Sequence, residues 1–441
     1  MTGKSTINQA VILCGGLGMR LRPLTDSLPK PMVMVNNKPF LHHLLEQLSG
    51  QGITQFLLLV GYLSEKISDY FGDGSQFGWS ISYSVGPIEW DTGRRVWEAR
   101  SHLKPQFMLL YSDNFVQFNL LNLMELHKKL ATPISLLLSP KLKGNIKVSK
   151  DGLILHYDNS RNGIGFDFVE VGYMIIEKDK ILRELANDPK FPNLNFSTVL
   201  QKLAEKQKIA GLVVGDAYHS ISDPERLELM KDYLRPKKIL LIDRDGTINQ
   251  KAPSGEYIAN WATFKWIPET RIAMRILAQQ GFKFIVITNQ AGIARKMIDP
   301  EALKDIHQKM IDNLAGDGVD VLKVYICPDH WDGNSPMRKP APGMFFEAAK
   351  DFNLRMDHCL YVGDDERDCQ AAVNAGCGMV YLTSENSHVV TEAQKKSFFT
   401  SSTLLDSVDR ILEFYQQLKF CELIYKIDGF LGRSLQLPLK G

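Results

Sequence analysis

The run Lys238-Ile-Leu-Leu-Ile-Asp-Arg-Asp-Gly-Thr247 decides the fold of the second half of this chain. An apolar strand delivers Asp243 and Asp245 into a glycine turn, and strand alternation points side chains two residues apart to the same side. Both carboxylates can therefore face one site, where Asp243 attacks phosphorus and Asp245 handles the proton of the leaving oxygen. The sequence predicts a phosphate-handling centre at the end of this strand.

Later segments supply the other groups that such a centre needs. A second apolar run, from Phe284, ends in a hydroxyl and two amides that suit phosphate oxygens: Thr288, Asn289 and Gln290. Lys339 offers a fixed cation that neutralises the phosphate and the attacking carboxylate. A third apolar run, from Leu360, ends in several acids. Because Mg²⁺ prefers oxygen ligands, we expect it on Asp243, Asp364 and the backbone carbonyl of Asp245; Asp365 and Asp368 can equally be solvated.

Four motifs in this half resemble haloacid-dehalogenase-type phosphatases, and specifically the heptose-1,7-bisphosphate 7-phosphatase branch, with histidinol-phosphate phosphatase as a near relative. They are DRDGTIN from Asp243, TNQAGIAR ending at Arg295, CPDH from Cys327 and RKPAPGM from Arg338. The resemblance covers roughly 237–385 and implies catalysis by Asp243, Asp245, Thr288 and Lys339. Substrate contacts would come from Asn289, Gln290, Arg295 and Arg338, the two arginines being candidates for a distal phosphate.

One loop departs from that branch. Its members bind zinc through a Cys-x-His pair and a Cys-x-Cys pair just before Arg-Lys-Pro. Here Asp329 stands at the expected histidine, and Ser335-Pro-Met337 replaces the second cysteine pair. Structural zinc sites hold four ligands, and Cys327 is left with a displaced His330. We therefore expect no zinc in this loop.

The first half opens with another phosphate signature. An apolar run, Gln9–Cys14, leads into a glycine-rich loop with Gly15, Gly16, Gly18 and Arg20, followed by Lys30. Glycines let backbone N–H groups approach a phosphate, and the two cations suit a triphosphate. The spacing matches neither a P-loop nor the dinucleotide fingerprint. The string GGLGMRLRPLT followed by PKPM resembles sugar-1-phosphate nucleotidyltransferases.

That resemblance implies further site residues, and this sequence also differs from the family's pattern at three places. Asp113, at a strand end, would bind the Mg²⁺ of the nucleotide, and Glu170 and Gly172 would contact the sugar. The family's second acidic metal ligand is replaced by Ser220, for which Asp216 or Asp223 would have to substitute. A Glu-Lys pair is missing around 157–161, and the segment 91–95 is bulkier and more basic than expected. A degenerate first domain, acting as a binding or regulatory module, is thus an alternative to an active transferase.

Composition sets the remaining limits. The 441 residues, 44% hydrophobic with a net charge of +2, fit a globular chain of two domains, without an argument for nucleic-acid or membrane partners. No run approaches the ~20 apolar residues of a membrane helix, and the polar N-terminus lacks the apolar core of a signal peptide. The six cysteines form no regular framework, which favours reduced thiols in a cytoplasmic protein.

Apolar strands alternate with amphipathic helices in both halves, which predicts an α/β fold: two domains, each a mainly parallel sheet flanked by helices. The expected boundaries are 1–234 for the transferase-like domain, 237–385 for the phosphatase domain and 386–441 for a helical extension and tail. Leu404–Lys419 has the spacing of a packing or dimer helix. The tail Cys421–Gly441 could dock on the body or on a partner, so a homo-oligomer stays open.

The fusion suggests one function for the whole chain. A 7-phosphatase converts heptose 1,7-bisphosphate to heptose 1-phosphate, which a sugar-1-phosphate nucleotidyltransferase then consumes. Transferases of the type resembled serve the α-anomer and use GTP, so the expected product is GDP-D-glycero-α-D-manno-heptose. Histidinol phosphate as phosphatase substrate, another sugar 1-phosphate or base, and a first domain that binds without turnover remain rivals.

Overall fold

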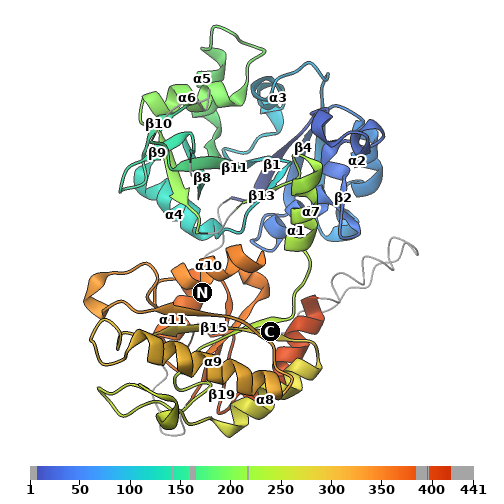
Figure 1. Ribbon diagram of the computed structural model, residues 1–441. Helices are drawn as coiled ribbons and strands as arrows, with labels where there is room; N and C mark the ends of the chain where they lie inside the picture. Colours follow the sequence, from blue (N-terminus) through green and yellow to red (C-terminus); the bar gives the residue numbers. More distant parts are fainter. Residues whose placement is uncertain are drawn as a thin grey trace. The chain divides into compact units, whose positions relative to one another are not determined.

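The computed structural model describes residues 7–141, 143–158, 165–215, 218–383, 395 and 397–418. The chain forms two compact units that divide between Leu234 and Arg235 (Figure 1). Each unit contains a β-sheet flanked by helices, and parallel pairing dominates, which confirms the predicted fold class. No helix within the described ranges is long and apolar enough to cross a membrane.

The sheet of the first unit has the order β10-β9-β11-β6-β1-β4-β5, and β8 joins β11 to β12. Strands β6, β1, β4 and β5 are parallel, whereas β11 runs antiparallel to β6 and β8. The strands are β1 (Gln9–Cys14), β4 (Gln55–Val60), β5 (Ser80–Val85), β6 (Gln106–Tyr111), β8 (Ile134–Pro140), β9 (Ile146–Val148), β10 (Ile154–Tyr157), β11 (Phe168–Glu177) and β12 (Ile209–Val213). Short pairs are β2 (Met34–Val35) with β3 (Lys38–Pro39), and β7 (Asn114–Phe115) with β13 (His219–Ser220).

Helices cover both faces of this sheet, so its central strand β1 is buried on both sides. Ala10 and Ile12 of β1 pack with one group of helices, and Val11 and Leu13 with the other. The first group is α1 (Phe40–Ser49), α2 (Ser64–Phe71), α4 (Leu120–Leu130) and α7 (Pro224–Tyr233); the second is α3 (Thr92–Glu98), α5 (Lys178–Ala186) and α6 (Phe196–Glu205).

The second unit is built on an all-parallel sheet of order β16-β15-β14-β17-β18-β19. Its strands are β14 (Ile239–Ile242), β15 (Lys283–Asn289), β16 (Val321–Cys327), β17 (Leu360–Gly363), β18 (Gly378–Leu382) and β19 (Phe399–Ser401). One face packs on α8 (Pro268–Gln279) and α9 (Pro300–Gly316), the other on α10 (Gly343–Phe352) and α11 (Glu366–Ala375).

The parallel strands bring the predicted site residues to one edge of each sheet. Strands β14, β15 and β17 are neighbours in register. Asp243 follows β14, Asp364 follows β17, and Thr288 lies near the end of β15. The same reasoning places Gly15 after β1 and Asp113 just beyond β6. Ligands collect at this edge of open α/β sheets.

The C-terminal part of the second unit holds a strand that the sequence did not predict. β19 forms the sheet edge beside β18. Residues 408–418 are helical, and Val408, Ile411 and Tyr415 are buried in the core of this unit, as expected of a packing helix. The tail Cys421–Gly441 lies outside the described residues.

Candidate active sites

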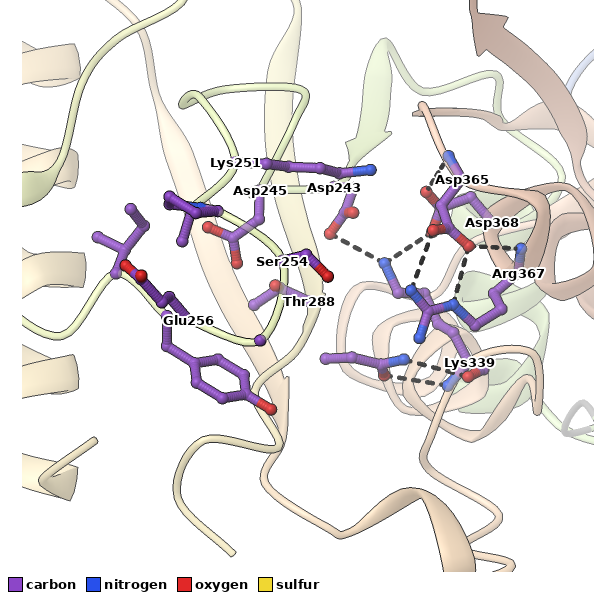
Figure 2. Close-up of a pocket in the computed structure, with 16 residues that line it drawn as sticks. Asp243, Asp245, Lys251, Ser254, Glu256, Thr288, Lys339, Asp365, Arg367 and Asp368 are labelled. Carbon is purple, nitrogen blue, oxygen red and sulfur yellow. Dashed lines mark hydrogen bonds and ion pairs between the residues drawn. The ribbon is translucent and has the colours of Figure 1, made fainter. Parts of the chain in front are cut away.

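A buried lysine organises the centre at the end of β14. The Lys339 Nζ lies 2.9 Å from Asp243 Oδ1 and 2.8 Å from Asp368 Oδ1 (Figure 2). It also donates to the Tyr361 hydroxyl at 2.8 Å. Burial disfavours the charged lysine, but the two carboxylates outweigh it and raise its pKa. Burial and the charge of Asp368 raise the pKa of Asp243 to about 7, against the attraction of Lys339. The lysine therefore stays charged beside the predicted nucleophile.

The second predicted catalytic acid is held from several sides. Arg244, which is fully buried, donates through Nη2 to both carboxylate oxygens of Asp245 at 2.8 Å. Asn249 and Gln290 add hydrogen bonds of 3.0 and 2.7 Å. Burial opposes ionisation of Asp245, but Arg244 and these amides outweigh it and lower the pKa. The carboxylate is thus fixed in its ionised form, the form that accepts a proton.

The carboxylates beside Lys339 fit a hard divalent cation. Asp243, Asp364 and Asp368 each offer an oxygen, and these oxygens lie within 4.8 Å of one another. The Asp364 Oδ1 is buried and has no hydrogen-bond partner among the described residues. Its Oδ2 lies 2.6 Å from the Lys251 ammonium. Three carboxylates with an unsatisfied oxygen are the donor set that Mg²⁺ takes. The side chain of Asp245 is not part of this cluster.

A pocket of about 230 Å³ opens over this centre. Asp243, Asp245, Thr288, Asn289 and Lys339 all line it, together with the loop from Lys251 to Ile258. The predicted residues Gln290, Arg295, Arg338 and Asp364 do not line it. Gln290 instead orients Asp245 and donates to the Thr288 hydroxyl at 2.9 Å.

The two predicted phosphate arginines lie farther out. The Arg295 guanidinium lies over the rings of Tyr257 and Trp331, at 5.7 and 5.2 Å from their centroids. Arg338 donates to the Asp329 carbonyl at 3.1 Å. Since Tyr257 lines the pocket, Arg295 sits just behind the pocket wall, and its role as a substrate contact stays a prediction.

The loop after β16 holds a small polar cluster. The buried Cys327 thiol lies 3.6 Å from an Asp329 carboxylate oxygen and 4.0 Å from the Ser335 hydroxyl. His330 pairs with Asp332 at 3.3 Å and its ring lies against Trp331. The thiol thus has Asp329 and Ser335 as its polar neighbours, whereas the histidine pairs with Asp332.

The first unit holds a larger pocket, of about 630 Å³. Every predicted transferase residue except Gly172 lines it: Gly15, Gly16, Gly18, Arg20, Lys30, Asp113 and Glu170. The Lys30 ammonium lies 2.7 Å from the Asp113 carboxylate, so a strand-end acid and a loop cation meet in the pocket. Gly172 lies in β11 behind the pocket, with a φ of 79°. The volume is in the range of ligand pockets that hold a nucleotide.

The segment 91–95 is more basic than the resembled transferases lead one to expect, and its Arg95 lines the pocket. The buried Arg95 guanidinium donates to the carbonyls of Val60, Pro87 and Trp90 at 2.9, 2.7 and 3.1 Å. A Cβ on Gly15 would come within 2.3 Å of its Cζ. The arginine thus ties the end of β4 to the loop between β5 and α3, next to the glycine-rich loop, and glycine is required at position 15 for space.

The acidic position that the sequence lacks is occupied by a serine cluster. The Ser220 and Ser222 hydroxyls lie 3.1 Å apart, and both residues line the pocket. Asp223, a possible substitute for the missing acid, does not line the pocket, and its carboxylate caps α7 by accepting from the Arg226 N–H at 3.0 Å; its role as a substitute stays a prediction. Asp216, and most of the segment where a Glu-Lys pair was missing, lie outside the described residues.

Comparison with known proteins agrees with this division. Residues 9–157 match the nucleotidyl transferase family, and residues 238–408 match the family described as polynucleotide kinase 3 phosphatase. The chain is 30% identical over 220 residues to D-glycero-alpha-D-manno-heptose 1-phosphate guanylyltransferase of Campylobacter jejuni, covering 49% of this chain and 96% of that protein. It is 33% identical over 174 residues to D-glycero-beta-D-manno-heptose-1,7-bisphosphate 7-phosphatase of Yersinia pestis, covering 38% of this chain and 91% of that protein. The chain belongs to the families of these two relatives, with its first unit in that of the guanylyltransferase and its second unit in that of the heptose-bisphosphate phosphatase.

The phosphatase unit also resembles an enzyme named for the other anomer. It is 27% identical over 183 residues to D-glycero-alpha-D-manno-heptose-1,7-bisphosphate 7-phosphatase of Photorhabdus laumondii, covering 40% of this chain and 97% of that protein.

Sequence reasoning missed several residues that shape the two sites. In the phosphatase unit these are the positioning groups Arg244 and His307, and Asp368, which the sequence left open as a solvated acid. In the transferase unit they are Arg95 and Arg226. Asp368 belongs to the acidic run after β17, and Arg95 to the basic segment 91–95, so both had a signal in the sequence. Arg226 gave none, because only the folded chain brings it to the pocket.

Proposed function

We propose that this chain is a bifunctional enzyme of nucleotide-activated heptose synthesis. The phosphatase unit removes the 7-phosphate of D-glycero-D-manno-heptose 1,7-bisphosphate, and the transferase unit moves GMP from GTP to the resulting heptose 1-phosphate. The observation that carries the proposal is the pairing itself: each unit has its own pocket, the second unit has relatives named as 7-phosphatases of α- or β-heptose 1,7-bisphosphate, and the first has a relative named as the guanylyltransferase of α-heptose 1-phosphate.

In the phosphatase unit, Asp243 attacks phosphorus and forms an aspartyl phosphate. Lys339 neutralises charge on the nucleophile and the equatorial oxygens, and the Thr288 hydroxyl contacts the phosphate from the pocket wall. For the first step Asp245 has to take up a proton from solvent as the substrate binds; it gives this proton to the leaving sugar oxygen as the bond between phosphorus and that oxygen breaks, and it then takes a proton from the water that attacks the aspartyl phosphate. The ion pair that holds Asp245 ionised in the free enzyme suits the second of these steps. Bound Mg²⁺ on Asp243, Asp364 and Asp368 would supply further charge neutralisation.

In the transferase unit, no covalent intermediate is needed. The glycine-rich loop binds the triphosphate through backbone N–H groups, and Arg20 and Lys30 compensate its charge. Asp113 is the carboxylate placed to hold the Mg²⁺ that accompanies a nucleoside triphosphate. The sugar 1-phosphate then attacks the α-phosphate, and pyrophosphate leaves.

The α-anomer is the favoured substrate. The phosphatase relatives carry either anomer in their names, but the product must fit the transferase on the same chain, whose relative is named for the α-sugar. The transferase unit therefore decides the anomer that the whole chain uses.

The test is mass spectrometry of products formed by the purified chain from each anomer of heptose 1,7-bisphosphate with Mg²⁺ and GTP. GDP-heptose from the α-anomer is the expected result, and Asp243→Asn should abolish phosphate release without unfolding the chain. Turnover by that variant would refute the nucleophile.

A second candidate function has an observation in its favour. Ser220 stands where the resembled transferases place an acid, so the first unit could bind a nucleotide sugar without turnover. Accumulation of heptose 1-phosphate, with nucleotide-sugar binding but no pyrophosphate release, would favour this reading.

A further inference from the structure

The serine that replaces the expected acid lies beside the candidate metal ligand of the transferase unit. Strands β7 and β13 pair Ser220 with Asn114, and the Ile221 N–H donates to the Asp113 carbonyl at 3.0 Å. Ser220 is therefore anchored next to Asp113 on the pocket wall. A hydroxyl is neutral, so the Ser220 side chain adds no negative charge for a cation there.

A positive side chain reaches this serine instead. The Arg226 Nη1 lies 3.3 Å from the hydroxyl oxygens of both Ser220 and Ser222. Its Nε lies 3.5 Å from an Asp223 carboxylate oxygen, and its Nη2 has no partner among the described residues. The side chain is 48% exposed and lines the pocket. The Nη1 and Nε of the guanidinium are thus engaged, and its Nη2 has N–H donors left for a ligand.

Two other cationic side chains line the same pocket as Arg226. Arg20, from the glycine-rich loop, and Lys30 line the pocket with Arg226. The hydrogen bond from the Arg226 N–H, with the charges of Arg226 and Arg20, lowers the pKa of Asp223. Arg20 and Arg226 thus act on one carboxylate from two different elements. Such a group of cations facing a ligand pocket matches the charge of phosphates.

We propose that Arg226 binds a phosphate group in the transferase reaction, and that Ser220 and Ser222 hold its guanidinium in place. The phosphate belongs either to the nucleoside triphosphate or to the sugar 1-phosphate. The inference rests on the proposed transferase function. A guanidinium presents paired donors to phosphate oxygens, which an ammonium cannot reproduce, so arginine is required rather than any cation.

The test compares Arg226→Met and Arg226→Lys with Lys231→Met, a control on the same helix whose side chain pairs with Glu228. Pyrophosphate release is measured while GTP and D-glycero-α-D-manno-heptose 1-phosphate are varied separately. Arg226→Met should raise the KM of one of these substrates about 10- to 100-fold, with a smaller rise for Arg226→Lys. Phosphate release by the same chains, and their thermal unfolding, should not change.

A rise confined to the KM of GTP assigns the arginine to the nucleotide, and a rise confined to the sugar phosphate assigns it there. Unchanged KM and kcat in Arg226→Met overturn the inference and leave the proposed function standing. Absence of pyrophosphate release by the unaltered chain overturns the transferase function instead. Calorimetric binding of GTP with Mg²⁺, and separately of the sugar 1-phosphate, then decides: equal affinities of the unaltered chain and Arg226→Met for both ligands overturn the inference, and weaker binding of either ligand by the variant supports it.

Ser220→Asp tests the inference in another way, by adding a negative charge beside Arg226 instead of removing the arginine. A carboxylate at this position would pair with Arg226 and withdraw it from the phosphate, so activity should fall by at least about tenfold. A gain of activity in Ser220→Asp would mean that the site lacks an acid rather than uses an arginine, and would overturn the inference.

Discussion

The charge balance of the phosphatase pocket depends on a single buried ammonium. Lys339 is 3% exposed and contacts Asp243 and Asp368, both of which are buried. Two buried carboxylates without a counter-ion are costly, because each loses its hydration and gains no compensating charge. The same lysine therefore serves both the stability of this unit and its chemistry.

We expect Lys339→Met to lower phosphate release by at least about 100-fold and the free energy of unfolding by about 3 kcal/mol. Lys323→Met is the matched control, since Lys323 pairs with Asp351 at the exposed surface and such a pair contributes less than about 1 kcal/mol. Urea unfolding and phosphate release measure both effects. Equal stability of the two variants would contradict the argument, and pyrophosphate release should persist in both.

His307 gives the phosphatase unit a predictable dependence on pH. Its Nε2 accepts from Arg244 at 2.8 Å, and burial, followed by the charge of Arg244, lowers its pKa from 6.5 to about 3. The unfolded chain then binds a proton at a higher pH than the folded chain, so stability is lost as the pH falls from about 6.5 towards 3. At pH ~4.5 the expected loss is about 2–3 kcal/mol.

His307→Gln should remove this part of the pH dependence, because the glutamine oxygen still accepts from Arg244 but does not titrate. Urea unfolding of both chains at pH 7 and pH 4.5 makes the comparison. The unaltered chain should lose more stability between the two pH values than the variant. Identical losses would show that His307 does not titrate on unfolding.

At the scale of elements, an irregularity in β11 shapes the transferase pocket. The pairing of β11 with β8 shifts register between Glu170 and Met174, and Gly172 lies within the shift with a φ of 79°. A Cβ at this position would come within 2.4 Å of the Tyr111 ring. Both Glu170 and Tyr111 line the pocket. The glycine thus allows the strand to present Glu170 while it packs against the tyrosine.

Gly172→Ala should lower the free energy of unfolding by about 2–3 kcal/mol, since backbone strain and steric overlap add, and it should raise the KM for the sugar phosphate. Gly165→Ala is the control: its φ of 85° is similar, but a Cβ there meets no atom of the described residues within 4 Å, so backbone strain is the effect expected. Thermal unfolding and pyrophosphate release measure the difference. If the two alanine variants behave alike, the contact with Tyr111 does not matter.

Sequence patterns predicted those elements whose apolar residues face a core. The strand ends that carry Asp113, Asp243 and Thr288 were predicted, because buried runs followed by polar residues mark where parallel strands end. Strand β19 and the pair β7–β13 were not, since two or three residues carry no period. Arg226 was missed for the same reason: it reaches the pocket through Ser220, which only the pairing of β13 places there.

At the scale of the whole molecule, the two pockets share no residues. The residues that line the transferase pocket all precede Leu234, and those that line the phosphatase pocket all follow Arg235. Each of these two pockets is therefore lined by residues of one unit, and inactivating one leaves the lining residues of the other in place. The sugar phosphate made in the second unit is the substrate proposed for the first, so the order of reactions is opposite to the order along the chain.

Because the residues that line each pocket all belong to one unit, two chains that are each inactivated in a different unit should complement each other in a mixture. Asp243→Asn alone should give no GDP-heptose from the bisphosphate, and Asp113→Asn alone should accumulate heptose 1-phosphate. Mixed in equal amounts, they should form GDP-heptose at about half the rate of the unaltered chain at the same total concentration, since half of the chains perform each step. Mass spectrometry follows both sugars. A mixture that accumulates heptose 1-phosphate without GDP-heptose would mean that the intermediate must pass between the two sites of one chain.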